Sequence, residues 1–315
     1  MPWGESGRER SLARTLEALA ATELGRARGL GRIASLADFR AEVPLLGLTE
    51  HAREVEAHLG FGLVDHGDPR AAELAGLGWE RPEAAAIWRG FLGERPLEGP
   101  VVVLQAREID RSVDRLLTDD LASLGAELIR IDRADGGREA LLEAIAGHAP
   151  AILTLPSVYT LSWLEGAARG PIERALPHLR LLLAGHDLSR RPRTRVRLES
   201  AGWIHRSGRL GIPSPRAPAR AFTLAVGSQL VELLPHREPG AEGERVLESA
   251  TILPEEAILG QRYELVVTSP VGCLRLRTDD HVEIVGFDPP TALAPFPRPR
   301  VVRLRPPPQR VALEG

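Results

Sequence analysis

The sequence predicts an α/β protein in which a parallel βαβ layer is followed by a β-rich layer. Between residues 101 and 185, short apolar runs alternate with segments of helical periodicity, an order that is typical of parallel βαβ units. From about Trp203 onwards, strand-like apolar runs follow one another with turn residues between them. These two patterns predict two differently built layers within one body.

The middle of the chain predicts strands that are connected by helices. The strands are expected at residues 101–106, 126–132, 151–156 and 179–185, and the helices at residues 109–124, 138–146 and 162–168. Before them, helical spacing predicts helices over residues 11–21, 38–43 and 49–59. Thr49 is the expected N-cap of the last one, because its hydroxyl can accept a bond from a free amide. Glycines interrupt residues 60–100, where only residues 82–91 predict a short helix.

The second half predicts strands within residues 222–228, 229–235, 263–269, 272–278 and 281–287. Pro270 and Gly272 are turn formers, so residues 263–268 and 272–277 are predicted to be neighbouring strands of one sheet. Prolines crowd residues 288–315 and predict an extended strap or loose tail, because proline lacks the amide that a helix or central strand needs. The predicted organisation is a body over residues 1–287, with a change near residue 200, and a Pro/Arg-rich tail over residues 288–315.

Composition excludes several kinds of function. The 40 basic and 43 acidic residues give a net charge of −3, which predicts no general attraction to nucleic acid or to anionic membranes. Every basic residue is arginine, so no Schiff-base lysine, P-loop lysine or lysine clamp on a phosphoryl group exists in this sequence. The polar start, the single Cys273 and the lack of a run of ~18 apolar residues predict a cytoplasmic protein without a membrane span or intrachain disulfide.

Four segments carry a family pattern. Residues 22–45 read TELGRARGLGRIASLADFRAEVPL, with a Thr-x-x-Gly-Arg run, an Asp-Phe-Arg and a Val-Pro pair, and residues 153–165 read LTLPSVYTLSWLE. Residues 202–213 read GWIHRSGRLGIP and precede QLVELLP at residues 229–235, and residues 263–287 read YELVVTSPVGCLRLRTDDHVEIVGF. Together these segments resemble the auxin-inducible acyl-acid-amido synthetases, the Gretchen Hagen family of the acyl-adenylate-forming superfamily.

The resemblance implies the large N-terminal body of an adenylate-forming ligase and a reaction in two steps. In that family, ATP and a carboxylic acid give an acyl-adenylate, and an amino acid amine then attacks it and releases AMP. The implied ligands are AMP, or ATP with magnesium, and a small carboxylic acid. A mobile C-terminal domain closes over the site in that family, and this sequence ends about where such a domain would begin.

The resemblance also implies where ligands bind. Asp280 matches the aspartate that accepts hydrogen bonds from both ribose hydroxyls, and a simple turn aspartate is the alternative. Arg277 shares one strand face with Arg275, and this face either looks toward the nucleotide or is a solvated strand face. Four further positions fall within motifs near the nucleotide and the acyl pocket: Ser207 and Gly208 at the middle motif, and Pro156 and Ser157 at the acyl stretch.

Three departures from the family pattern bear on catalysis. Residues 65–100, where the phosphate loop should lie, contain no serine or threonine to wrap a triphosphate. Ser207 stands before Gly208 where the family has a glutamate that helps to hold magnesium, so no metal ligand is assigned. Asp279 replaces the glycine that precedes the ribose-binding aspartate. The motifs therefore identify no catalytic residue.

These departures predict a pseudoenzyme, an impaired homologue that binds an acyl acid or a nucleotide weakly or serves as the partner subunit of another protein. One alternative is an active AMP-forming ligase that joins a carboxylic acid to an amino acid with missing elements supplied in trans. A second alternative is a structural remnant that binds no ligand. A hydrolase built on His205 and Ser207 is disfavoured, because no GxSxG elbow surrounds the serine.

Two further groups of residues have simple structural interpretations. His51 and His58 lie two helical turns apart, which is too far for one zinc ion, and they are predicted to be surface histidines. The arginines within residues 190–197 have no aromatic neighbours that could stack on bases. They predict a solvated loop and strand and no nucleic-acid site.

Overall fold

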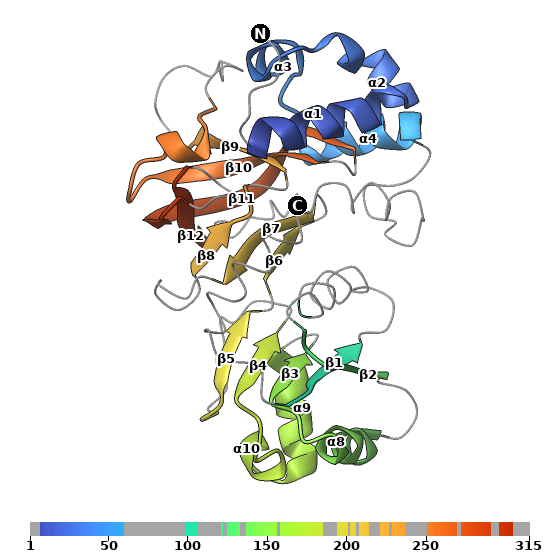
Figure 1. Ribbon diagram of the computed structural model, residues 1–315, viewed down its shortest axis with the longest axis vertical. Helices are drawn as coiled ribbons and strands as arrows, with labels where there is room; N and C mark the ends of the chain where they lie inside the picture. The colour runs from blue at the N-terminus through green and yellow to red at the C-terminus, as the bar shows by residue number, and fades with distance from the viewer. Residues whose placement is uncertain are drawn as a thin grey trace, which may run out of the picture. The chain divides into compact units, whose positions relative to one another are not determined.

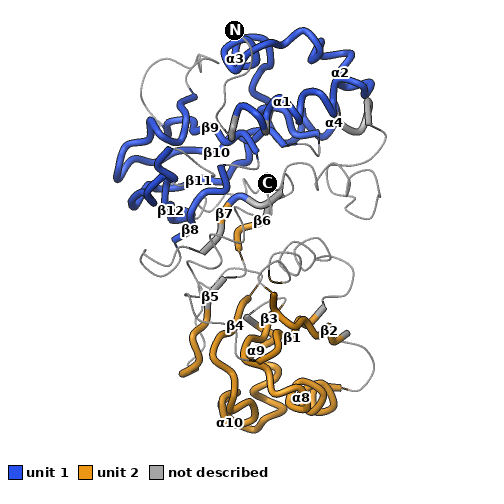
Figure 2. Tube along the Cα trace, viewed as in Figure 1, with its two compact units in different colours: residues 1–80, 205–210, 221–315 blue, residues 81–204, 211–220 orange. Residues whose placement is uncertain are grey.

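The computed structural model describes residues 7–59, 99–105, 121, 125–132, 137–155, 158–184, 194–200, 202–205, 208–213, 221–226, 229–236, 251–269, 272–290 and 296–304. The chain divides into two compact units, residues 1–80, 205–210 and 221–315 in one and residues 81–204 and 211–220 in the other (Figure 2). One described sheet is parallel and the other has antiparallel pairs, so the predicted α/β class with two different layers is confirmed. None of the described helices is long and apolar enough to cross a membrane.

The unit that contains residues 81–204 is built on a parallel sheet with the order β2-β1-β3-β4-β5 (Figure 1). Its strands are β1 (Val101–Gln105), β2 (Leu128–Asp132), β3 (Ile152–Leu155), β4 (Leu181–Ala184) and β5 (Arg197–Ser200). The side chains of β3 and β4 are buried along their whole length, as expected for central parallel strands that are covered on both faces. The predicted strands are confirmed. Strand β5 begins inside the arginine run, where Arg195 and Arg197 are exposed.

Helices connect these parallel strands. Helix α8 (Gly137–Gly147) precedes β3, and helices α9 (Val158–Ala168) and α10 (Ile172–Ala175) connect β3 to β4. Ile145, Leu161 and Ile172 are completely buried and share one apolar core with the strands. Two predicted helices are confirmed, although α9 begins at Val158, earlier than expected. The helix predicted over residues 82–91 and nearly all of the one over 109–124 lie outside the described residues.

The second sheet has the order β6-β7-β8-β12-β11-β10-β9. Its strands are β6 (Trp203–His205), β7 (Gly208–Pro213), β8 (Ala221–Leu224), β9 (Leu230–Pro235), β10 (Arg262–Ser269), β11 (Cys273–Asp288) and β12 (Arg298–Leu304), and a 3-10 turn, η2 (Pro254–Glu256), precedes β10. Strands β10 and β11 pair in antiparallel fashion, so the predicted pairing of residues 263–268 with 272–277 is confirmed. The runs 272–278 and 281–287 are two parts of one long strand.

The proline-rich end of the chain contains a central strand, and the prediction that residues 288–315 supply only a strap or tail is wrong for residues 298–304. Strand β12 lies between β11 and β8 and pairs with both. Only residues 300–302 pair with β8, whereas Pro299 falls where the strand pairs with β11 alone. The missing amide of Pro299 therefore falls outside the stretch that needs hydrogen bonds on both sides.

Helices of the N-terminal segment cover part of the second sheet (Figure 1). They are α1 (Gly7–Ala20), α2 (Glu23–Ala27), α3 (Leu36–Glu42) and α4 (Leu48–Leu59), with a 3-10 turn, η1 (Leu30–Arg32), after α2. Leu12, Leu19 and Phe39 are at most 1% exposed and form one core with Leu230 and Leu276 of the sheet. The predicted helices over residues 11–21, 38–43 and 49–59 are confirmed as α1, α3 and α4.

The start of α4 differs from the prediction, because Thr49 is not its N-cap. The helix begins at Leu48, and the carbonyl of Gly47 accepts from the amide of His51 at 2.9 Å. The amide of Gly47 in turn donates to Oε2 of Glu50 at 3.1 Å. Glycine and a glutamate three residues later thus take the capping roles, and Thr49 lies exposed in the first turn.

Candidate functional site

Strand β11 is irregular at two places within the segment that carries the aspartate motif. Thr268 of β10 faces two residues of β11, and one of them, Arg275, has a φ of 46°. Leu265 faces three residues of β11, and the middle one, Asp279, has a φ of 56°. Positive φ favours glycine and, among other residues, aspartate and asparagine. The backbone before Asp280 therefore has the form that favours the glycine of the family pattern, although the residue here is Asp279.

Asp280 lies in this second irregularity and is buried, with 6% of its surface exposed. Its Oδ1 atom accepts from Nε of Arg303 at 2.7 Å and lies 2.5 Å from Nη2 of the same guanidinium. Its amide donates to Oγ1 of Thr278 at 3.2 Å, and that hydroxyl donates to the carbonyl of Leu265 at 3.0 Å. The carboxylate is thus fixed in a strand and ion-paired, so the interpretation as a simple turn aspartate is wrong.

Arg277 is held by a different carboxylate. Its Nη2 and Nε atoms lie 2.7 and 3.1 Å from Oε2 of Glu264, whose side chain is 5% exposed. The amide of Asp279 donates to the same glutamate at 3.4 Å. The hydrogen bonds and negative charge of Glu264 raise the pKa of Arg277 above its usual value, despite an opposing contribution from burial. Arg277 is therefore a fixed cation.

The side chains of Arg277 and Asp280 lie on opposite faces of the sheet. Glu264, the partner of Arg277, is paired with His281, whereas Arg303, the partner of Asp280, is paired with Val282. Because successive residues of a strand point to opposite faces, the two ion pairs are separated by the sheet itself. One nucleotide bound against Asp280 cannot contact Arg277 through the same face, which weakens the assignment of Arg277 to the cofactor.

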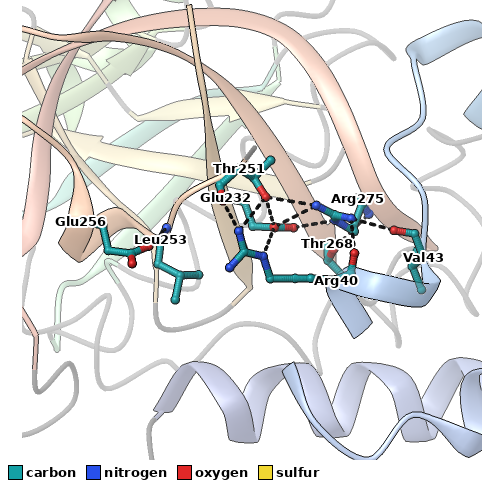
Figure 3. A network of polar contacts seen from close by, with 8 residues as sticks. All are labelled: Arg40, Val43, Glu232, Thr251, Leu253, Glu256, Thr268 and Arg275. Carbon is teal, nitrogen blue, oxygen red and sulfur yellow. Dashed lines mark hydrogen bonds and ion pairs between the residues drawn. The ribbon is translucent and has the colours of Figure 1, made fainter. Parts of the chain in front are cut away.

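Arg275 is completely buried, so its interpretation as part of a solvated strand face is wrong. Figure 3 shows its guanidinium against Glu232 of β9, with Nε 3.0 Å from Oε2, and both side chains are 1% exposed. Nη1 of Arg275 donates to the carbonyls of Arg40 and Val43 at 2.9 and 2.8 Å, at the end of α3. Thr251 donates to the same glutamate at 2.6 Å. From the bulge, Arg275 thus contacts both strand β9 and the end of α3.

The buried network joins three of the four segments that carry the family pattern. Arg40 belongs to the Asp-Phe-Arg stretch, and its Nε lies 3.1 Å from Oε1 of Glu232. Glu232 belongs to the run at residues 229–235, and Arg275 to the segment at 263–287. These pattern residues connect α3, β9 and β11 (Figure 3). Several residues of the family pattern thus hold together the unit that contains residues 1–80, 205–210 and 221–315.

His51 is also buried, with 1% of its surface exposed, and the prediction of a surface histidine is wrong for it. Its Nε2 atom accepts from the amide of Leu274 at 3.3 Å, and its Nδ1 atom is buried without a hydrogen-bond partner among the described residues. Burial lowers the pKa of His51, with opposing contributions that include the charge of Glu54. The side chain of His58 lies outside the described residues.

The remaining predicted ligand positions lie at the ends of strands. Gly208 begins β7, and Ser207 lies outside the described residues. Pro156 and Ser157 lie outside them as well, directly after the carboxyl end of β3. Strands β2 and β3 flank β1 on opposite sides, so the order of strands reverses between β1 and β3. Ligands of open parallel sheets bind at the carboxyl ends of strands next to such a reversal.

The ion-pair partners of the motif residues were missed in the sequence. They are Glu264 for Arg277, Arg303 for Asp280 and Glu232 for Arg275. A signal for two of them was present, because Glu232 and Glu264 are single acids inside apolar strand runs. An acid at such a position is rarely buried without a cation, so it predicts a nearby arginine. No group of three or more His, Cys, Asp or Glu side chains is placed to hold a metal ion in the described part of the chain.

Comparison with known families supports the pattern found in the sequence. Residues 222–294 match the model of the GH3 family central domain, a segment that includes β9, β10, β11 and the motif around Asp280. The expected resemblance to the acyl acid amido synthetases is therefore confirmed for this part of the chain. No curated protein matches the chain in sequence.

Solved structures of adenylate-forming ligases have a similar fold. An open conformation of 2-hydroxyisobutyryl-CoA ligase with 2-HIB-AMP and CoA has a TM-score of 0.61 and 16% identity, over 93% of this chain and 72% of that one. The GH3.15 acyl acid amido synthetase has a TM-score of 0.63 and 14% identity, over 93% of this chain and 67% of that one. The same synthetase with 2,4-DB has a TM-score of 0.60 and 13% identity, over 94% and 67%. The fold is therefore that of an adenylate-forming ligase body.

Proposed function

We propose that this protein binds the adenosine part of a nucleotide at Asp280 and is impaired in forming acyl-adenylates. The observation that carries the proposal is the position of Asp280, a buried carboxylate on β11 that follows a residue with positive φ at the motif position. A carboxylate of this kind accepts hydrogen bonds from two ribose hydroxyls, and charge-assisted bonds contribute roughly 1.5–3 kcal/mol each. The similar 2-hydroxyisobutyryl-CoA ligase holds an acyl-adenylate, which is consistent with an adenosine site in this fold.

A small carboxylic acid is the second proposed ligand, near Pro156 and Ser157. These residues follow the carboxyl end of β3, beside the reversal of strand order that marks ligand sites in open parallel sheets. The similar GH3.15 synthetase is complexed with 2,4-DB. Ser207 and Gly208 at the middle motif are the proposed neighbours of the nucleotide.

The proposed impairment of acyl-adenylate formation rests on missing groups that would bind phosphate and magnesium. Residues 65–100 contain no serine or threonine, Ser207 replaces the glutamate linked to magnesium, and the sequence has no lysine. Loss of one preorganised electrostatic group typically lowers a rate by ~10²–10³, and two or more are changed here. An impaired chain of this kind could still act as the partner subunit of another protein.

ATP–pyrophosphate exchange tests the impairment. We expect the isolated protein to show no exchange above a control without enzyme, across a panel of aryl and alkyl carboxylic acids with magnesium. Exchange clearly above that control would overturn the proposal. It would favour the second candidate, an active AMP-forming ligase that conjugates a carboxylic acid to an amino acid, which its similarity to ligases of known structure supports.

Calorimetry with AMP and with ATP plus magnesium tests the adenosine site. We expect weak binding of AMP and no tighter binding of ATP, because no phosphate cradle offsets the extra charge and Asp279 adds a negative charge beside the site. Asp280→Ala should abolish AMP binding, and Arg262→Gln on the same sheet is the matched control. Unchanged binding by Asp280→Ala would show that the carboxylate is not a ribose ligand, and much tighter binding of ATP would reveal a phosphate site.

A further inference from the structure

The carboxylate proposed for the ribose is engaged by a side chain of the protein itself. Nε and Nη2 of Arg303 lie 2.7 and 2.5 Å from one oxygen, Oδ1 of Asp280. Two donors of one guanidinium thus converge on a single acceptor atom. The other oxygen, Oδ2, is buried away from solvent. A ribose that approaches from solvent would therefore meet this carboxylate at Oδ1, so the guanidinium and the ribose compete for that oxygen.

The two partners of this ion pair differ in exposure. The side chain of Asp280 is 7% exposed, whereas that of Arg303 is 52% exposed. The backbone of Arg303 is fixed opposite Val282 in the β11–β12 ladder, which begins at His281, so the arginine reaches past the end of the ladder to Asp280. The carboxylate cannot move far, but the half-exposed guanidinium can turn toward solvent around its long apolar stem.

We infer that Arg303 is an internal competitor for the ribose at Asp280, and that a nucleoside binds only when the guanidinium turns away from the carboxylate. The inference rests on the proposed adenosine site. In this inference Arg303 lowers the affinity of the protein for nucleosides and does not itself bind the nucleoside. The ion pair also gives the buried carboxylate a cationic partner when no nucleoside is bound, since an unpaired buried charge is costly.

The competition is measurable with adenosine, because this ligand carries no charge of its own. Arg303→Gln removes the cation but keeps a polar side chain of similar length. We expect Arg303→Gln to bind adenosine about two- to fivefold more tightly than the native protein, as half-exposed ion pairs contribute up to about this factor. Arg303→Lys should give an intermediate affinity, because one ammonium replaces the two converging donors.

A matched control separates the ion pair from a general change in charge. Arg262 pairs with Glu283 at 3.5 Å on the same sheet, and Arg262→Gln removes the same charge without touching Asp280. We expect Arg262→Gln to bind adenosine as the native protein does. If Arg303→Gln binds adenosine no more tightly than Arg262→Gln, the inference is wrong.

Ionic strength gives a second measurement that needs no variant to fold. Salt screens the half-exposed pair, so the affinity of the native protein for adenosine should rise about two- to threefold between about 0.05 and about 1 M NaCl. A flat or falling affinity would overturn the inference.

Asp280→Asn distinguishes a failure of the proposed adenosine site from a failure of the role proposed for Arg303. If it binds adenosine as the native protein does, the proposed adenosine site fails. If it loses binding while Arg303→Gln matches the native protein, only the role of Arg303 fails.

Discussion

Arg275 and Glu232 form an ion pair in which both side chains are 1% exposed and Nε lies 3.0 Å from Oε2. The pair spans β10 and connects β11 to β9, and the same guanidinium donates to two carbonyls at the end of α3. One side chain therefore links the N-terminal helices to two strands of the sheet. Because the pair is buried, removal of Arg275 leaves the buried charge of Glu232 with Arg40 as its remaining described cation, which compensates the charge less fully.

We expect Arg275→Met to lower the free energy of unfolding by about 3 kcal/mol, since Glu232 is then buried beside Arg40 alone. Urea unfolding followed by circular dichroism measures the change. The control is Arg262→Met, which breaks an exposed pair on the same sheet and should cost less than about 1 kcal/mol. The double variant Arg275→Met/Glu232→Leu should recover part of the loss. If Arg275→Met is as stable as the control, the network does not hold the helices to the sheet.

The buried His51 predicts a dependence of stability on pH. Its Nε2 accepts the amide of Leu274, and burial lowers the pKa of the folded imidazole below its unfolded value of about 6.5. The unfolded chain therefore binds the proton more readily than the folded chain, so this contribution to stability is present above about pH 6.5 and is lost as the pH falls below that value. Glu54 opposes the shift and Arg28 adds to it.

Urea unfolding at about pH 7.5 and about pH 5 tests this contribution. We expect His51→Gln to be less stable than the native protein at the higher pH but to lose less stability on acidification. His178→Gln, at an exposed position, should keep the native dependence on pH. An identical loss of stability on acidification for His51→Gln and the native protein would contradict the assignment.

Cys273 is the single cysteine of the sequence and is completely buried, and burial raises the pKa of its thiol to about 12. Because the thiolate is the reactive form, we expect no measurable reaction with a thiol reagent at about pH 8 in the native protein. In denaturant, one thiol per chain should react. The reaction rate at low denaturant should follow the unfolding equilibrium. Rapid reaction in native buffer would show that the β10–β11 turn opens locally.

At position 279, we expect glycine to preserve the stability of the protein and a β-branched residue to lower it. The φ of Asp279 is 56°, and its amide donates to Glu264, a bond that any residue can make. Asp279→Gly should therefore change the free energy of unfolding by less than about 1 kcal/mol, whereas Asp279→Val should lower it by about 1–3 kcal/mol. Thermal or urea unfolding of both variants measures the difference. Equal stabilities would show that the bulge adjusts its backbone to the residue.

The sequence by itself determined the local structure and the class of the fold. Helical spacing located α1, α8 and most of α9, and short apolar runs located the strands from β1 to β4. Pro270 and Gly272 indicated the turn between β10 and β11. These features depend on neighbours within a few residues, so periodicity and turn chemistry are sufficient to find them. The resemblance of four whole segments to the acyl-acid-amido synthetases predicted the ligase fold.

Only the tertiary structure decided which charged side chains are buried and what they contact. Arg275 alternates with leucines as an exposed arginine would, yet it is buried against Glu232, 43 residues away in the sequence. His51 accepts from Leu274, 223 residues away. Asp280 is paired with Arg303, 23 residues away, on a strand within the proline-rich segment that was predicted to be a strap or tail. Periodicity in the sequence shows which face of a helix or strand is apolar. A charged side chain is buried only where a partner of opposite charge or a hydrogen-bonding group lies nearby, and only the folded chain brings such partners together.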